Sequence, residues 1–158
     1  MITLPADTLT AYLARIFDAC GAPAEEARLV AEHLVGANLR GHDSHGVIRA
    51  PWYVGFVRQG VLRPGARPLV VKESASTAYL DGQWNFGQVV AREAMSIAIA
   101  KARDTGVGVV SAFNSGHIGR VGAYGEQAVE AGMIGIGSVN SPGSGLVAPF
   151  GGARRRRA

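Results

Sequence analysis

The chain has 158 residues, of which 47% are hydrophobic and 18% are charged. This length can bury one sizeable core, and the composition excludes disordered and fibrous proteins. The formal net charge of +4 comes from the last residues, because Arg154 to Arg157 supply four of the 16 basic side chains and the first 153 residues hold 12 basic and 12 acidic ones. We therefore predict no nucleic-acid partner, since the body of the chain has no basic excess.

The cysteine count and the first residues bear on location. A single cysteine, Cys20, excludes an internal disulfide and a zinc ribbon, which favours a reducing compartment. The first five residues lack a basic and apolar leader, and no apolar run approaches the roughly 18 residues of a membrane span. The sequence predicts a cytoplasmic protein with no membrane partner.

Helical periodicity dominates the first third of the chain. Asp7 is predicted to cap a first helix that ends at Gly21, and a second helix is predicted to begin near Pro23 and to stop at Arg40–Gly41. A third is predicted over 48–59. The apolar positions that define these helices are Leu9, Leu13, Ile16 and Cys20, then Ala27, Val30, Leu34 and Ala37, then Trp52, Tyr53, Phe56 and Val57.

After Pro68 the pattern alternates between strands and helices. Strands are predicted at 69–71, 77–80, 107–110 and 133–139, and helices at 87–102 and 121–131. The fold class is therefore α/β or α+β: a helical N-terminal part followed by a mixed sheet with helices. We divide the chain into a helical region at 1–65, an α/β region at 66–152 and a basic tail at 153–158 outside the native fold.

The loop at 40–49 carries two histidines, an acid, a hydroxyl and two arginines between two predicted helices. His45 could relay a proton, with Asp43 or Ser44 fixing its tautomer, and Arg49 could bind a carboxylate through two parallel bonds. A capping loop, in which Asp43 and Ser44 satisfy backbone donors, is an equally good explanation. A metal site formed by His42, Asp43 and His45 is a third, but no further ligand cluster lies nearby, and we predict no metal.

A second polar segment, at 114–120, follows a predicted strand and precedes a helix. Ligand sites in α/β proteins favour this place, the carboxyl end of a strand. His117 could take a hydroxyl proton there while hydride leaves the adjacent carbon. The alternative is a structural histidine that caps the following helix.

The segment at 138–145 is rich in serine and glycine and could present backbone amides to a phosphate. Residues 143–148 fit the pattern GxGxxA. However, Pro149 and the glycines after it stand where the Rossmann fingerprint requires a helix. We reject a Rossmann site and keep a general glycine-rich cofactor loop.

Three separated motifs resemble those of the type-2 malate/L-lactate dehydrogenases, a non-Rossmann family that includes ureidoglycolate and sulfolactate dehydrogenases. The motifs are Ala37 to Arg49, Asn114 to Arg120 with Gly122 and Tyr124, and Ala148 to Gly152; segments 87–91 and 131–135 fit in order and spacing. The resemblance extends over about residues 5–152.

This resemblance implies a non-Rossmann fold, NAD or NADP as hydride carrier, a homodimer, and 2-hydroxy or 2-oxo acids such as malate or lactate as substrates. His117 matches the proton-transferring histidine and Arg49 the carboxylate-binding arginine. Ser44 and His45 match the loop that lines the nicotinamide and substrate site. Asn140 and Ser141 match a strand-end segment that contacts the cofactor.

Family members are roughly twice as long as this chain. We therefore expect a carboxyl-terminal truncation and an incomplete fold, with the four arginines as the product of a shifted reading frame or a sequencing error; a genuine short paralogue is the alternative. Two hypotheses follow: an NAD(P)-dependent oxidoreductase chain, and an inactive fragment or non-catalytic association module of the same family. Nucleic-acid binding through the arginine tail is a third, which the formally neutral body of the chain disfavours.

Overall fold

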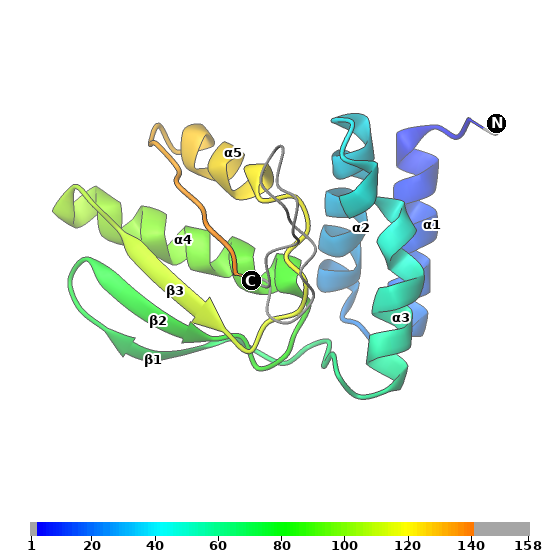
Figure 1. Cartoon of the computed structure of the whole chain (residues 1–158), viewed down its shortest axis with the longest axis horizontal. Coiled ribbons are helices and arrows are strands. Elements are labelled where there is room, and N and C mark those ends of the chain that lie inside the picture. Colours follow the sequence, from blue (N-terminus) through cyan, green and yellow to red (C-terminus); the bar gives the residue numbers. More distant parts are fainter. Residues whose placement is uncertain (1–2, 141–158) are drawn as a thin grey trace, which may run out of the picture.

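The computed structural model describes residues 3–140, which form a helical part and an α/β part, as the sequence predicts (Figure 1). The helical part comes first, and the sheet with its two helices follows. In chain order the elements are α1 (Ala6–Ala19), α2 (Ala24–Leu39), the 3-10 turns η1 (Asp43–His45) and η2 (Val47–Arg49), α3 (Ala50–Arg58), β1 (Leu69–Glu73), β2 (Thr77–Asp81), α4 (Gly87–Thr105), β3 (Val109–Phe113) and α5 (Gly122–Glu130).

The sheet is mixed and has the strand order β1-β2-β3. Strand β1 pairs antiparallel with β2, with Leu69 opposite Asp81. Strand β3 pairs parallel with β2, with Asp81 opposite Phe113, and α4 makes the crossover between them. The parallel pair brings the carboxyl ends of β2 and β3 to the same edge of the sheet, next to the helical part (Figure 1).

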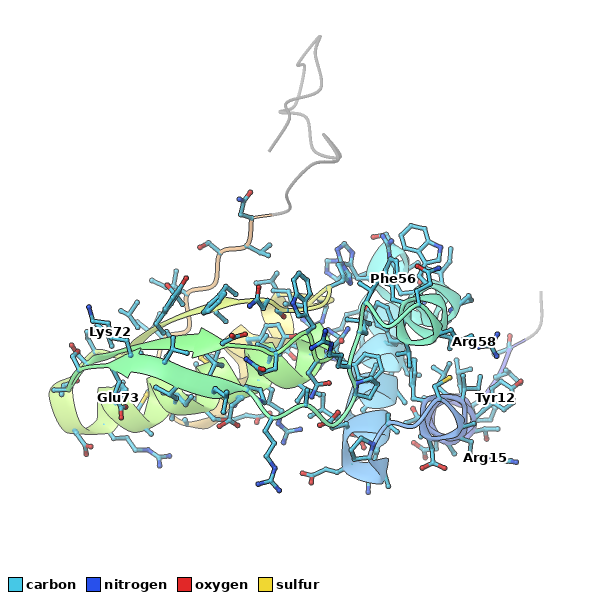
Figure 2. All side chains as sticks on the ribbon, turned by 90° about the horizontal axis from the view of Figure 1, so that it is seen from below. Tyr12, Arg15, Phe56, Arg58, Lys72 and Glu73 are labelled. Carbon is cyan, nitrogen blue, oxygen red and sulfur yellow. The ribbon has the colours of Figure 1, made fainter. Side chains whose placement is uncertain are left out.

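Helix α4 covers one face of the sheet. Ala78 and Leu80 of β2 are buried, whereas the intervening Tyr79 is 44% exposed and stacks on Phe113 with ring centroids 4.6 Å apart. The alternation follows from the two-residue period of a strand, which points successive side chains to opposite faces. Figure 2 shows Lys72 and Glu73 at one end of the molecule, and Tyr12, Arg15, Phe56 and Arg58 of α1 and α3 at the other.

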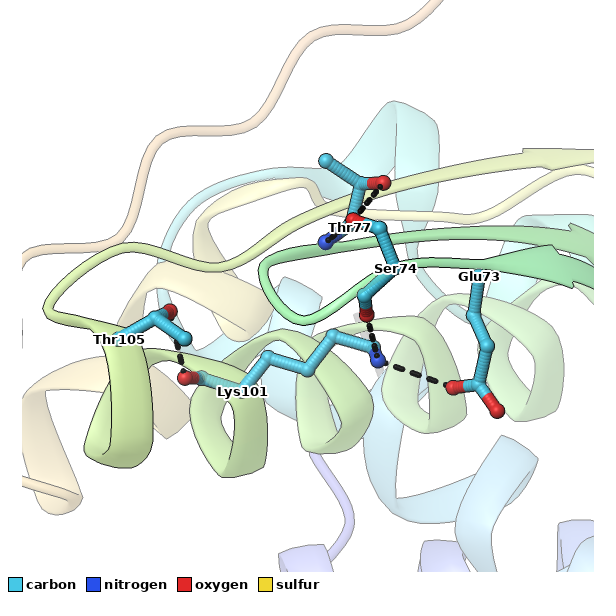
Figure 3. A network of polar contacts seen from close by, with 5 residues as sticks. All are labelled: Glu73, Ser74, Thr77, Lys101 and Thr105. Carbon is cyan, nitrogen blue, oxygen red and sulfur yellow. Dashed lines mark hydrogen bonds and ion pairs between the residues drawn. The ribbon is translucent and has the colours of Figure 1, made fainter.

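Lys101 of α4 ties the helix to the β1–β2 hairpin (Figure 3). Its Nζ donates to Glu73 Oε2 at 2.9 Å and to the Ser74 carbonyl at 2.7 Å. The turn itself is closed by the Ser74 and Thr77 hydroxyls, 2.8 Å apart. The ammonium thus satisfies a carbonyl that the turn leaves free.

A single hydrophobic cluster joins the helical part to the α/β part. Phe17 of α1, Tyr53 of α3 and Phe86, which precedes α4, form its aromatic centre, with ring centroids 5.6 to 6.3 Å apart. Glu26 of α2 adds a polar link, since its carboxylate accepts from the Gly65 amide at 2.9 Å and from Asn85 Nδ2 at 3.0 Å. These contacts fix the start of α4 against α2 and α3.

The predicted helices are confirmed, with two differences at their starts. Asp7 does not cap α1: the helix begins at Ala6 with Pro5 at the N-cap position, and Asp7 lies in the first turn, where its charge favours the positive helix end. The third helix begins at Ala50 rather than 48, because η2 precedes it. All four apolar positions predicted for α2 are buried.

Two strand predictions need correction. The strand expected at 107–110 lies at Val109–Phe113, where it pairs with β2. The strand expected at 133–139 does not form in the described part of the chain, and Ile134 and Ile136 are 92% and 89% exposed. Its apolar residues have strand propensity, but a strand needs a hydrogen-bonded neighbour, and within residues 3–140 this segment has none.

Candidate active site

The loop between α2 and α3 is anchored by Asn38. Its Oδ1 accepts from the Val47 amide at 2.8 Å, and its Nδ2 donates to Asp43 Oδ1 at 2.6 Å. Gly46 lets this amide approach, since a Cβ there would lie 2.1 Å from Asn38 Oδ1. The anchor holds η1 and η2 in fixed positions at the end of α2.

Within this loop, side chains bond to one another rather than cap a helix. Ser44 Oγ lies 2.8 Å from His45 Nδ1, while Asp43 bonds to Asn38, so the hydroxyl and not the acid contacts the His45 ring. Neither η1 nor α3 has a side-chain cap. The capping interpretation of Asp43 and Ser44 therefore has no support in the structure.

Two contacts fix the Arg49 side chain, one at its Nε atom and one at the face of its guanidinium group. Its Nε donates to the Ser44 carbonyl at 2.5 Å, and its guanidinium carbon lies 4.5 Å from the centroid of the Trp52 ring. Among residues 3–140, its terminal nitrogens have no hydrogen-bond partner. A guanidinium fixed in this way can offer those nitrogens to a carboxylate in a parallel pair of bonds.

The second loop, after β3, is held by backbone contacts and by His33. The Gly116 amide donates to the Asn85 carbonyl at 3.1 Å, and the Arg120 amide donates to His33 Nε2 at 2.9 Å. A Cβ at Gly87 would lie 2.2 Å from the Gly116 carbonyl, so only glycine at the start of α4 allows this approach. His117 makes no cap on α5, which begins at Gly122.

The two loops meet at their histidines. The His45 and His117 rings stack with centroids 5.3 Å apart and an interplanar angle of 27°. Tyr53 of α3 also contacts His117, with its hydroxyl 2.8 Å from His117 Nδ1. His117 itself is exposed and His45 is half-buried, so both rings line the surface that a ligand would meet.

Both histidines have lowered pKa values, which keep their rings neutral near neutral pH. Desolvation lowers the pKa of His117 to about 4, with smaller contributions in the same direction from the positive Arg49 and from His45. Desolvation, followed by Arg49 and His42, also lowers the pKa of His45. Near neutral pH, each ring therefore has one nitrogen that donates and one that accepts.

The remaining predicted positions lie at the end of the described residues or outside them. Asn140 is exposed at the end of the described chain, whereas Ser141, the rest of the glycine-rich loop and the third motif at 148–152 lie outside the described residues. In residues 3–140, no three His, Cys, Asp or Glu side chains form a group that could hold a metal ion. In the same range, no helix is both long and apolar enough to cross a bilayer.

The two loops bring the Arg49 guanidinium and the His117 imidazole, 68 residues apart in sequence, to one part of the surface. Comparison with known proteins decides the family. The sequence profile of the malate/L-lactate dehydrogenases matches residues 4–157. The chain belongs to this family. The family assignment made from the three motifs is therefore confirmed.

Relatives of this malate/L-lactate dehydrogenase family chain include the malate dehydrogenase of Pyrococcus horikoshii, 47% identical over 98% of this chain, and hydroxycarboxylate dehydrogenase B of Escherichia coli K12, 44% identical over 96%. The solved structure of the Pyrococcus horikoshii malate dehydrogenase superposes with a TM-score of 0.81 over 83% of this chain, at 42% identity. The chain spans 42% of the length of these two relatives and 38% of the solved structure.

Three residues of the site were missed by the sequence analysis. Tyr53 was assigned only to the apolar stripe of a helix, and His33 and Gln88 were not singled out. Tyr53 contacts His117 across 64 positions, Gln88 contacts Tyr53 across 35, and His33 contacts Arg120 across 87. No local pattern signals contacts at such separations.

Proposed function

We propose that this chain carries the substrate-binding and proton-exchanging part of an NAD(P)-dependent dehydrogenase of 2-hydroxy acids such as malate or lactate. The observation that supports the proposal is the meeting of Arg49 and His117 at one exposed surface, with His45 stacked between the two loops. The names of the relatives, malate and hydroxycarboxylate dehydrogenases, point to the same chemistry.

Each polar end of a 2-hydroxy acid finds a complementary group. The terminal nitrogens of Arg49 suit the C1 carboxylate, and His117 exchanges the proton of the C2 hydroxyl through its free Nε2. Ser44 orients His45 through its Nδ1 contact, so His45 presents a defined edge to the bound molecules. Oxidation removes the hydroxyl proton and a hydride from C2 and leaves a 2-oxo acid.

The exposed polar side chains are chemically suited to a nicotinamide. The His45 imidazole, beside His117, and the Asn140 amide can both hydrogen-bond a carboxamide or a ribose hydroxyl, and Ser141 is proposed to extend this set. When bound, the nicotinamide accepts or donates hydride at C4. NAD and NADP remain alternatives, because the residues described include none assigned to the ribose 2'-position.

A homodimer in the cytoplasm is part of the same proposal. Its support, beside the family, is an apolar stripe on the outer face of the η2–α3 segment, where Ile48, Trp52 and Phe56 are 68%, 60% and 39% exposed at four-residue spacing. Sedimentation of the purified chain at several concentrations tests the dimer.

Cofactor titration tests the proposed function. NADH and NADPH are titrated into the purified chain by fluorescence, with and without pyruvate or oxaloacetate. We expect saturable binding of one of the two and its oxidation once the oxo acid is added. Absence of both binding and oxidation contradicts the proposal for this chain and favours the non-catalytic association module.

Replacing Arg49 with Lys tests the carboxylate site separately. Lysine keeps the charge but cannot form two parallel bonds, so we expect pyruvate to bind about tenfold more weakly, the loss of one charge-assisted hydrogen bond. Nicotinamide binding should change little. The measurement is the pyruvate dependence of the His117 ring signals in NMR, with Arg58→Lys on the exposed side of α3 as the control; equal pyruvate affinity in wild type and Arg49→Lys refutes the role.

A further inference from the structure

A buried chain of hydrogen bonds leads from His117 into the core. His117 Nδ1 lies 2.8 Å from the Tyr53 hydroxyl, and Gln88 Nε2 donates to the same hydroxyl at 2.8 Å. Tyr53 is 2% exposed and Gln88 is fully buried. The three side chains come from the loop after β3, from α3 and from the first turn of α4, so the rigid helices fix two of the three members.

Counting protons along this chain determines the tautomer of His117. Tyr53 has one hydroxyl hydrogen, and its oxygen already accepts the hydrogen from Gln88 Nε2. Among the described side chains, only His117 Nδ1 is in place to accept that hydrogen, so with Gln88 donating, Nδ1 is the acceptor. A neutral His117 then carries its proton on Nε2, the nitrogen that faces the ligand surface.

One buried atom of this series of hydrogen bonds has no partner among the described residues. Gln88 Oε1 is buried and has no hydrogen-bond partner among the described residues. An unsatisfied buried acceptor costs about 1–3 kcal/mol, and such an atom calls for an explanation. If the Gln88 amide turns by 180°, its oxygen accepts from the Tyr53 hydroxyl. The Tyr53 oxygen then accepts from His117 Nδ1–H, and His117 Nε2 is left without a proton.

We propose that Tyr53 and Gln88 are positioning residues that select the tautomer of His117, with the Gln88 amide as a two-position switch. With Gln88 donating, Nε2–H is presented to the carbonyl oxygen of a 2-oxo acid. With Gln88 accepting, bare Nε2 is presented to the hydroxyl of a 2-hydroxy acid. The role rests on the proposed function, because the tautomer matters for turnover only if His117 exchanges the substrate proton.

Among the described groups around His117, the Tyr53 hydroxyl is the one that can select between its two neutral tautomers. Arg49 and His45 face the His117 ring, and both oppose its positive charge rather than favour either neutral tautomer. Desolvation raises the pKa of Tyr53 to about 12, so the phenol keeps its proton at neutral pH. Of the side chains described, only Tyr53 hydrogen-bonds to Nδ1.

The test is the ring-nitrogen NMR spectrum of His117 in the ligand-free, 15N-labelled full chain near pH 8. In the wild type we expect Nε2–H in about tenfold excess, the ratio that one hydrogen bond of ordinary strength gives. In Gln88→Glu, the carboxylate accepts only, so Tyr53 must donate to it and the ratio should reverse toward Nδ1–H. A wild type with mainly Nδ1–H, or no shift in a folded Gln88→Glu chain, overturns the proposal.

A double-mutant cycle separates the relay from a simple charge effect. In the Tyr53→Phe background, Gln88→Glu should no longer change the tautomer ratio, because the connecting hydroxyl is gone. A reversal that persists there overturns the relay. Tyr79→Phe, which removes an exposed hydroxyl on the sheet, is the matched control and should keep the wild-type ratio.

Tyr53→Phe alone should abolish the wild-type excess, which keeps the test decisive if Gln88→Glu does not fold. The measurement is also independent of turnover. A tautomer reversal in a chain that binds no cofactor would support the relay and contradict the proposed function. Cofactor binding without a reversal of the tautomer ratio would contradict the relay and support the proposed function.

Discussion

Replacement of His117 with Ala is expected to lower turnover by about 100- to 10,000-fold, the usual contribution of a general acid/base. The variant removes the imidazole that lies beside Arg49. This ring is exposed on one side and hydrogen-bonds to the buried Tyr53 on the other. Substrate affinity should change much less, because Arg49 still binds the carboxylate. The measurement is the oxidation of NADH or NADPH by pyruvate or oxaloacetate at saturating concentrations.

His42→Ala is the matched control for this variant. His42 is exposed in the loop next to η1, and no described side chain hydrogen-bonds to its ring, so turnover should stay near the wild-type rate. If His117→Ala retained full turnover, His45, whose ring centroid lies 5.3 Å away, would become the proton-exchanging group. A control as slow as His117→Ala would reveal a role for His42 that its surroundings do not indicate.

The fold was predictable where packing follows a local period. The stripe of α2 repeats every three or four residues, and all its predicted positions are buried because one helix face meets α1 and the cluster around Phe17. Segment 133–139 shows the limit. Its apolar residues have the composition of a strand, but pairing depends on a neighbour that lies elsewhere in the chain, and composition does not report that neighbour.

The site was predictable as far as exposed polar loops reveal it. His45, Arg49 and His117 stand in short polar segments between regular elements, and the structure brings these segments together. Tyr53 and Gln88 were not predictable because each occupies a helix position that suits an apolar core residue. The contact between their polar side chains depends on the approach of α3 to the start of α4, which no local pattern reports.

Acidification is expected to destabilise the fold through His33. The pKa of His33 is lowered from its usual value of 6.5 to about 4, mainly by desolvation and also by Arg120, His117 and His45, with Glu126 acting in the opposite direction. The ring also stacks on Tyr124, with centroids 5.7 Å apart. Because its Nε2 accepts the Arg120 amide, a proton on that nitrogen would place a donor against a donor.

The sign follows from the two pKa values. The unfolded chain takes up a proton on His33 below pH 6.5, whereas the folded chain does so only near pH 4, so the stability contributed by the neutral ring is complete above pH 6.5 and is lost as the pH falls toward 4. Linkage gives a loss of about 2 kcal/mol between pH 7.5 and 5. Urea unfolding at both pH values measures it.

His33→Gln isolates this effect from other titrating groups. The glutamine oxygen can accept the Arg120 amide but does not titrate in this range, so the variant should lose about 2 kcal/mol less than the wild type on the same acidification. Equal losses in the two proteins would assign the acid sensitivity to other groups. Because Arg120 lies three residues after His117 and its amide is held by His33, acid should also release the loop after β3 first, which hydrogen exchange at residues 116–120 would reveal.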